Sequence, residues 1–249
     1  MIHTMLRVRK LLSWIVTIPF ITGFGLLLLL FDVVGRIVRP FSFRGFEWVM
    51  ASLQWSLLRL FQIFGTSIEV ERPDDLSPGT GYAILSNHQS MLDIVMIGGI
   101  LLSNFPKYVA KKELSNWIPS ISLNLKGGGN ALIDRDDPRQ AIRAIKEMAG
   151  TAQERGVSAV IFPEGHRSKD GNLLPFKTAG AKSMLKAADR LPVVPVVISG
   201  SWELNRLVPF TPGVKVRIAF GSPIPRNPGD ESDVIRQVEE WMQSKLVSA

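Results

Sequence analysis

The sequence predicts an α/β protein, with a mostly parallel central sheet flanked by helices and an N-terminal membrane-associated helical segment before it. Two observations indicate this architecture. From about Thr66 onward, short apolar runs alternate with stretches of helical length, which is typical of parallel strands joined by helices. Before that point, Leu11 to Phe31 carry no charge, and a helix of this length covers roughly 30 Å, the thickness of a hydrocarbon core. We expect a membrane-anchoring helical pair over residues 1–65 and an α/β domain over residues 66–249.

The uncharged run is too long for the apolar part of a typical signal peptide, so we expect it to be retained. Basic residues lie on both sides of it, so their distribution does not predict its orientation. The next segment, Phe46 to Phe64, mixes Trp and Phe with polar residues that include Arg59. This composition favours a second helix that lies in the membrane interface and pairs with the first. The alternative is one spanning helix followed by an ordinary core helix of the domain.

The elements of the α/β part follow from local patterns. Asp137 before Pro138 is a good helix start and Gly156 after Arg155 a good stop. The expected strands are Ser67–Val70, Tyr82–Leu85, Lys107–Ala110, Ala131–Ile133, Ser158–Phe162, Val193–Ile198 and Val214–Phe220. The expected helices are Ser90–Leu102, Pro138–Arg155, Thr178–Asp189 and Ser232–Val247.

Composition limits the chemistry. Lys and Arg number 29 against 22 Asp and Glu, a formal charge of +7 that suits anionic partners. This charge is spread along the chain and lies beside a membrane segment, so we expect no nucleic-acid partner. The absence of cysteine excludes a thiolate nucleophile and Cys-ligated metals. Because His3 and His166 are far in sequence from His88, we expect no metal site. We also expect no cofactor.

The stretch from Asn87 to Asp93 follows an apolar strand and leads into an apolar helix. Residues five apart on one helix point about 140° apart, so His88 and Asp93 can meet only if His88 lies in the loop and Asp93 in the first helical turn. An acid there would fix the imidazole tautomer and leave the other nitrogen as a base. The competing interpretation is a capping box, with Ser90 as N-cap and Asp93 as its partner. The two interpretations are compatible.

Two further polar corners follow strands. Glu164 and Arg167 leave the strand that ends at Phe162, and Lys169 and Lys177 extend the positive charge. Arg167 has the geometry to hold a phosphate; the alternative is a surface turn with solvated charges.

Arg135, which follows the earlier apolar run Ala131–Ile133, is a second candidate phosphate ligand, and the alternative is a salt bridge to Asp134, Asp136 or Asp137. Lys112 belongs to a basic patch with Lys107 and Lys111, for which a solvated face is the default interpretation.

Four segments together carry a resemblance: NHQSMLD, GNALIDR, FPEGHRS and VPVVISG, in that order. In order and spacing they resemble the four motifs of the glycerolipid acyltransferase family, in particular its 1-acylglycerol-3-phosphate acyltransferases. The resemblance covers roughly residues 66–225. It implies the glycerolipid acyltransferase fold and transfer of an acyl group from a thioester to the free hydroxyl of lysophosphatidic acid, which gives phosphatidic acid.

The resemblance also implies roles. His88 would be the general base, oriented by Asp93, and the hydroxyl would attack the thioester directly. Glu164 and Gly165 would contact the glycerol backbone. Arg167 and Arg135 would hold the phosphate, with Ser168 beside them in the third motif. Lys112 would face the donor, and backbone N–H groups near residues 88–93 would stabilise the oxyanion. Position 166 is His, where many relatives carry Thr, so a substrate-binding or pH-sensing role stays open.

The partners implied are acyl-CoA or acyl carrier protein as donor, lysophosphatidic acid and the phospholipid bilayer. The implied place is the bacterial inner membrane, with the catalytic domain on its cytoplasmic face. Two alternatives remain: an acyltransferase for another lysophospholipid or lipid acceptor, and a non-catalytic lipid-binding membrane protein that uses the basic surface and the anchor.

Overall fold

The computed structural model describes residues 2–227 and 229–247, with side chains for 13–227 and 229–246. Its centre is a seven-stranded sheet of order β1-β7-β6-β2-β5-β3-β4. Every neighbouring pair is parallel except β6 and β7, so the expectation of a mostly parallel sheet is confirmed. The strands are β1 (Ser67–Glu71), β2 (Ala83–Ser86), β3 (Lys107–Lys111), β4 (Ala131–Ile133), β5 (Ala159–Ile161), β6 (Val193–Ser199) and β7 (Lys215–Phe220).

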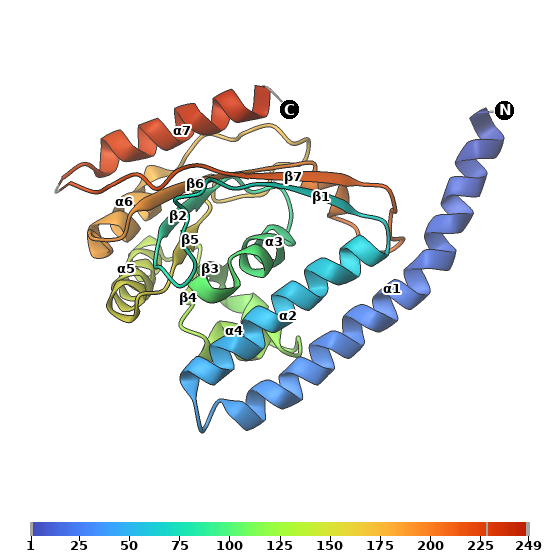
Figure 1. Ribbon diagram of the computed structural model, residues 1–249, viewed down its shortest axis with the longest axis horizontal. Helices are drawn as coiled ribbons and strands as arrows, with labels where there is room; N and C mark the ends of the chain where they lie inside the picture. Colours follow the sequence, from blue (N-terminus) through green and yellow to red (C-terminus); the bar gives the residue numbers. More distant parts are fainter. Residues whose placement is uncertain (1, 228, 248–249) are drawn as a thin grey trace.

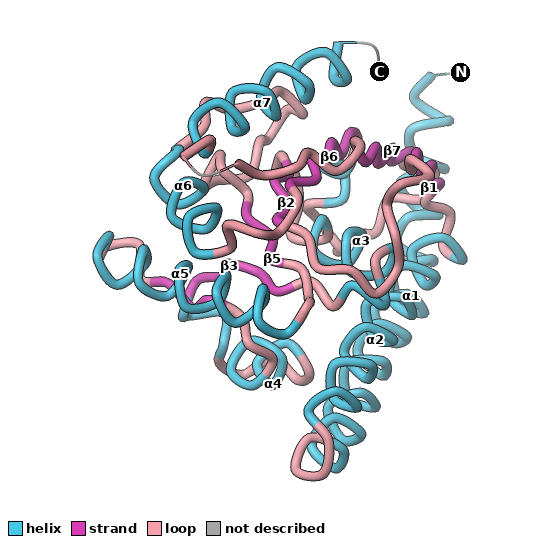
Figure 2. Tube along the Cα trace, turned by 60° about the vertical axis from the view of Figure 1, so that its left-hand side comes forward, coloured by secondary structure: helices cyan, strands magenta, loops and turns pink. Residues whose placement is uncertain are grey.

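Helices cover both faces of the sheet (Figure 1; Figure 2). One face packs against α5, α6 and α7 around Met148, Met184 and Val238. The other packs against α3 and the N-terminal helices around Phe61 and Met96. The helices are α1 (Ile2–Val38), α2 (Phe43–Ile63), α3 (Asp93–Ile100), α4 (Ile121–Gly127), α5 (Pro138–Arg155), α6 (Thr178–Ala187) and α7 (Glu231–Val247), with short 3-10 turns at Leu102–Asn104, Lys112–Ser115 and Ser201–Leu204.

The first two helices run side by side as a hairpin (Figure 1). Ser42 in the turn caps α2, because its side-chain oxygen accepts from Gly45 N at 2.9 Å. Among the described residues, one helical stretch, Ser13–Val38, is long and apolar enough to cross a membrane. Its outer side is apolar and open, with Ile18 72% and Leu26 60% exposed, whereas ordinary soluble proteins seldom leave such a large apolar face uncovered.

α2 is held between α1 and the sheet domain. Glu47 is buried, and its carboxylate lies 2.6 Å from Lys107 Nζ of β3 and 2.8 Å from Arg155 of α5. A buried carboxylate needs such partners because burial without them is costly. The helix therefore has features of both sequence interpretations: it pairs with α1 and it also packs onto the domain.

Most element boundaries agree with the sequence patterns to within one or two residues. The main difference is the helix expected from Ser90, which begins only at Asp93, with Leu92 at the N-cap position. Residues 87–92 are a loop because their polar groups bond to Asp93, Glu164 and β6 instead of a helical ladder. The helix α4, which ends in the Gly127–Gly129 run, was not expected, since its seven residues are too few for a clear periodic pattern.

Candidate active site

The loop after β2 is fixed in place by Asn87. Its side-chain oxygen accepts from Ile198 N at 2.7 Å, and its amide nitrogen donates to Ile198 O at 2.8 Å. Because β2 and β6 are parallel neighbours, their carboxyl ends meet, and this paired hydrogen bond joins them there. The next residue, His88, is thereby placed at the outlet of the sheet, where α/β proteins commonly bind ligands.

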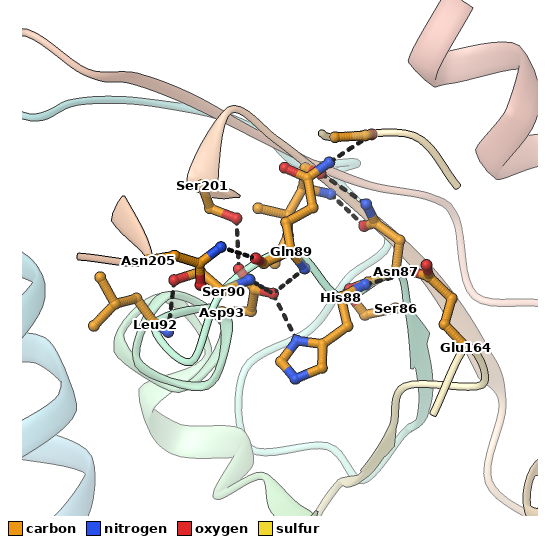
Figure 3. Close-up of polar contacts among 12 residues, drawn as sticks. Ser86, Asn87, His88, Gln89, Ser90, Leu92, Asp93, Glu164, Ser201 and Asn205 are labelled. Carbon is orange, nitrogen blue, oxygen red and sulfur yellow. Dashed lines mark hydrogen bonds and ion pairs between the residues drawn. The ribbon is translucent and has the colours of Figure 1, made fainter. Parts of the chain in front are cut away.

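His88 and Asp93 meet in the one arrangement that their spacing allows, with His88 in the loop and Asp93 in the first helical turn (Figure 3). His88 Nδ1 lies 2.8 Å from Asp93 Oδ2. That same oxygen accepts from the backbone N–H groups of Gln89 and Ser90, and Ser201 Oγ donates to Oδ1 at 2.7 Å. Asp93 is fully buried. A carboxylate held by these donors makes Nδ1 of His88 the protonated nitrogen and leaves Nε2 with a free lone pair.

The imidazole is also held by an aromatic ring. Its plane stacks on Phe162 at 4.1 Å between ring centroids and 19° between planes. His88 keeps 17% of its side chain exposed. No described residue makes a hydrogen bond to Nε2, and Figure 3 shows this nitrogen on the far side of the ring from Asp93. The arrangement therefore presents one unprotonated ring nitrogen to the space beside it.

That space is a cleft with two adjoining lobes, and His88 lines both. The larger lobe, about 620 Å³, has apolar walls from Met91, Ile94 and Leu114 and basic residues Arg167 and Lys169 at its edge. The second lobe, about 390 Å³, runs toward α5 and α6. The residues lining both lobes are His88, Val109, Ala110, Lys111, Arg135, Phe162 and His166. A mixture of apolar walls and cationic edges suits a molecule with an acyl chain and an anionic group.

Glu164 occupies a different position from the one the resemblance implies. It is 2% exposed and lines neither lobe. Its two oxygens accept from the backbone N–H groups of His88, at 2.6 Å, and Leu174, at 2.9 Å. Burial raises the pKa of Glu164 to about 7 despite these bonds. Its observed contacts tie the His88 loop to the loop before α6.

The other residues of the third motif surround the cleft. Arg167 is exposed at the larger lobe and Gly165 lines the second. Ser168 is buried, donates from its backbone N–H to His88 O at 2.7 Å, and lines the larger lobe. Arg135 forms none of the salt bridges considered above; it donates to Gly165 O at 2.8 Å. The structure therefore brings Arg135 and Arg167 to one cleft from segments separated in sequence.

The basic residue at the end of β3 that lines both lobes is Lys111. Lys112 is instead paired with Asp134 and lines neither lobe. Sequence reasoning could not distinguish these adjacent lysines, because the strand ends between them and neighbouring residues there point in different directions.

One contact was not found from the sequence. Ser201, a direct partner of Asp93, immediately follows the fourth motif, so its place after a strand was the available signal. The backbone N–H groups of His88, Gln89 and Ser90, expected near the oxyanion, are already bonded to Glu164 and Asp93. Among the described side chains, no cluster of three or more His, Asp or Glu residues suited to a metal ion is found.

Comparisons with known proteins agree with the fold. A family model described as Acyltransferase matches residues 67–199. A 1-acyl-sn-glycerol-3-phosphate acyltransferase of Cocos nucifera is 34% identical over 186 residues, which are 72% of this chain and 57% of that protein. The protein of the same name from Escherichia coli K12 is 33% identical over 152 residues, 60% of each chain. The chain thus spans less than two thirds of these relatives.

A solved structure has the same architecture. The crystal structure of the 1-acyl-sn-glycerophosphate (LPA) acyltransferase PlsC from Thermotoga maritima superposes with a TM-score of 0.77, at 22% identity, over 96% of this chain and 97% of that one. The resemblance found in the four motifs is confirmed by the family model, which covers more than half of the chain and contains His88, Asp93 and the third motif. The chain belongs to the Acyltransferase family.

Proposed function

We propose that this protein transfers a fatty acyl group from an acyl thioester to the free hydroxyl of 1-acylglycerol 3-phosphate, which gives phosphatidic acid. The observation that supports this most is the His88–Asp93 pair at the junction of a two-lobed cleft with apolar walls and cationic edges. The names of the relatives point to the same acceptor. Either acyl-CoA or acyl carrier protein would serve as donor.

The chemistry balances with one base. His88 Nε2 removes the proton of the acceptor hydroxyl while the oxygen attacks the thioester carbonyl. When the C–O bond has formed, the C–S bond breaks, and the proton on Nε2 passes to the leaving thiolate. Asp93 stabilises the imidazolium that exists between these steps and holds the ring in place. No covalent acyl-enzyme is needed.

Arg135 and Arg167 would hold the acceptor phosphate, with Ser168 lining the larger lobe and Gly165 the second. The contacts of Glu164 and Lys112 support roles that differ from those the resemblance implies. We assign Glu164 to positioning of the His88 loop, since both its oxygens are occupied by backbone donors. Lys112 would reach a donor only by leaving Asp134, whereas Lys111 already lines the cleft.

The exposed apolar side of α1 suits insertion into a bilayer. Lipid substrates would then reach His88 without transfer into water, which costs about 0.8 kcal/mol per CH₂ group. We propose a bacterial inner membrane with the catalytic part on the cytoplasmic face, where acyl thioesters are made. The hairpin of α1 and α2 would enter the bilayer with its exposed side.

The test is an activity panel with purified protein, labelled acyl-CoA or acyl carrier protein, and a set of lysophospholipid acceptors. We expect phosphatidic acid from lysophosphatidic acid, and a loss of roughly 10²–10⁴-fold in His88→Ala. Product formation that does not depend on His88 would reject the mechanism. Activity that survives both Arg167→Ala and Arg135→Ala would favour an acceptor without a phosphate monoester.

A further inference from the structure

His166 is surrounded by cations. Lys177 Nζ lies 2.9 Å from its Nε2, and Arg135 lies 3.3 Å from its Nδ1. Lys111, at the end of β3, lines both lobes of the cleft beside it. Within the described part of the chain, none of these three cations forms an ion pair with a carboxylate. Three positive groups therefore converge on one imidazole without a counter-ion.

The hydrogen bonds at His166 are also incomplete. Lysine and arginine only donate, so each contact requires an acceptor on the ring, but a neutral imidazole has one acceptor nitrogen and one N–H. In one of the two contacts, the ring N–H of His166 therefore faces another hydrogen-bond donor, Lys177 or Arg135, with no acceptor between them. A bound anion would accept from the ring N–H and from both cations at once, and it would remove the conflict.

The other charged or titratable residues that line the cleft are Asp134 after β4, Arg167 and Lys169 on the loop that carries His166, and His88 after β2. Glu164 is buried next to this loop and lines neither lobe. Asp134 is paired with Lys112, and Glu164 is buried and bonded to two backbone donors. Among the described residues, the two carboxylates nearest to these cations, Asp134 and Glu164, are therefore already engaged by other donors.

We propose that His166 takes up a proton when the phosphate of the acceptor binds, so that His166, Lys177 and Arg135 together hold the phosphate monoester as a dianion. This inference rests on the proposed function and adds its charge-state specificity. In the free protein, the positive charge of Lys177, some loss of hydration, and the charges of Arg135 and Lys111 hold the pKa of His166 below its ordinary value. A phosphate dianion bound among these groups adds negative charge next to His166, which raises its pKa and favours the protonated imidazolium.

The consequence is a definite pH dependence. A phosphate monoester has its second pKa near ~6, so above pH ~7 the ligand is already a dianion and only the protein changes its protonation on binding. Binding that takes up a proton weakens as the pH rises. We therefore expect the affinity for lysophosphatidate to fall between pH ~7 and ~8.5. A phosphodiester carries one negative charge, so it should bind more weakly and with less proton uptake.

The experiment is isothermal titration calorimetry of the full-length protein in detergent, without acyl donor. The probe is lysophosphatidate with a six-carbon acyl chain, titrated near pH ~7.5 in three buffers of different ionisation enthalpy at one ionic strength. The slope of the observed enthalpy against the buffer ionisation enthalpy gives the number of protons taken up. The methyl phosphodiester of the same lipid is the ligand control.

We expect proton uptake in the wild type and almost none in His166→Gln, which keeps a polar side chain but cannot titrate. The variant should bind the monoester roughly two- to fivefold more weakly, the range for an exposed charge contact, with an unchanged melting temperature. His3→Gln is the matched control, since the chain has three histidines, and it should take up protons as the wild type does.

The outcomes separate the two proposals. Binding of the monoester with no buffer dependence, or with equal uptake in His166→Gln, would overturn the inference and leave the acyltransferase proposal intact. If the wild type neither binds nor acylates lysophosphatidate but acylates another lipid, the proposed acceptor fails and the inference fails with it.

Discussion

The two histidines of the cleft have opposite surroundings. His88 faces a buried carboxylate that accepts from three further donors, so its Nδ1 contact is complete within the protein. His166 faces Lys177 and Arg135, which donate and cannot accept, and it lies at the exposed edge. The His88 side of the cleft is therefore preorganised by the protein, as general-base catalysis requires. The His166 side is completed by a ligand.

The substitution expected to have the largest effect is Asp93→Asn, which disrupts the His88–Asp93 pair. The amide keeps the shape but places a donor or a neutral oxygen against Nδ1, so the imidazolium loses its compensating charge. We expect the rate of acyl transfer to fall by roughly 10²–10⁴-fold with the acceptor KM little changed. Steady-state kinetics measures this. A rate within a few-fold of wild type would show that Asp93 only holds the loop at Gln89 and Ser90 in place.

The ligand-completed side is tested by Arg167→Met, which removes a cation that forms no ion pair with any carboxylate of the described residues. Loss of one charge-assisted hydrogen bond is worth about 1.5–3 kcal/mol, so we expect the KM for lysophosphatidate to rise about 10- to 100-fold. The melting temperature should not fall. Lys169→Met, at the same edge of the larger lobe, is the matched control and should change KM less. Equal effects would indicate a diffuse field instead of a specific contact.

Glu164 joins the His88 loop to the loop before α6, and its protonation predicts how the stability of the protein depends on pH. Its pKa is about 7 in the folded protein, against an ordinary value of 4.5, so the folded state holds its proton more tightly than the unfolded chain. The resulting stabilisation is complete below pH ~4.5 and is lost as the pH rises to about 7. The melting temperature of Glu164→Gln relative to wild type should therefore increase from pH ~5 to ~8. Glu154→Gln, an exposed control, should show no such trend.

The smallest expected effect is that of Ser201→Ala, which removes one donor from Asp93 and leaves the others. A hydrogen bond of this kind contributes about 0.5–1.5 kcal/mol, so the melting temperature should fall by a few degrees and the rate by less than ~10-fold. Thermal unfolding and kinetics on the same preparation measure both. A loss as large as that of Asp93→Asn would mean that Ser201 itself contacts the reacting groups.

Local pattern was sufficient for most of the architecture. Alternating apolar runs placed all seven strands, and the Asp137–Pro138 start and Gly156 stop placed α5, because capping and strand burial depend on residues close in sequence. The spacing of His88 and Asp93 restricted their contact to one arrangement, with His88 in the loop and Asp93 in the first helical turn, because both residues lie within five positions. The order of the four motifs identified the family.

The tertiary structure decided what depends on residues far apart in the chain. Ser201 donates a hydrogen bond to Asp93, 108 positions away in the sequence. Arg135 contacts Gly165 and His166 and not the neighbouring aspartates. It also placed Lys111 at the cleft and Lys112 on Asp134. The sequence by itself determined the elements, their order and the candidate base, since these follow from short-range periodicity. The pairing of parallel strands decided which charged residues meet at the cleft. The carboxyl ends of these strands bring together residues that are far apart in the sequence, and no local pattern predicts such contacts.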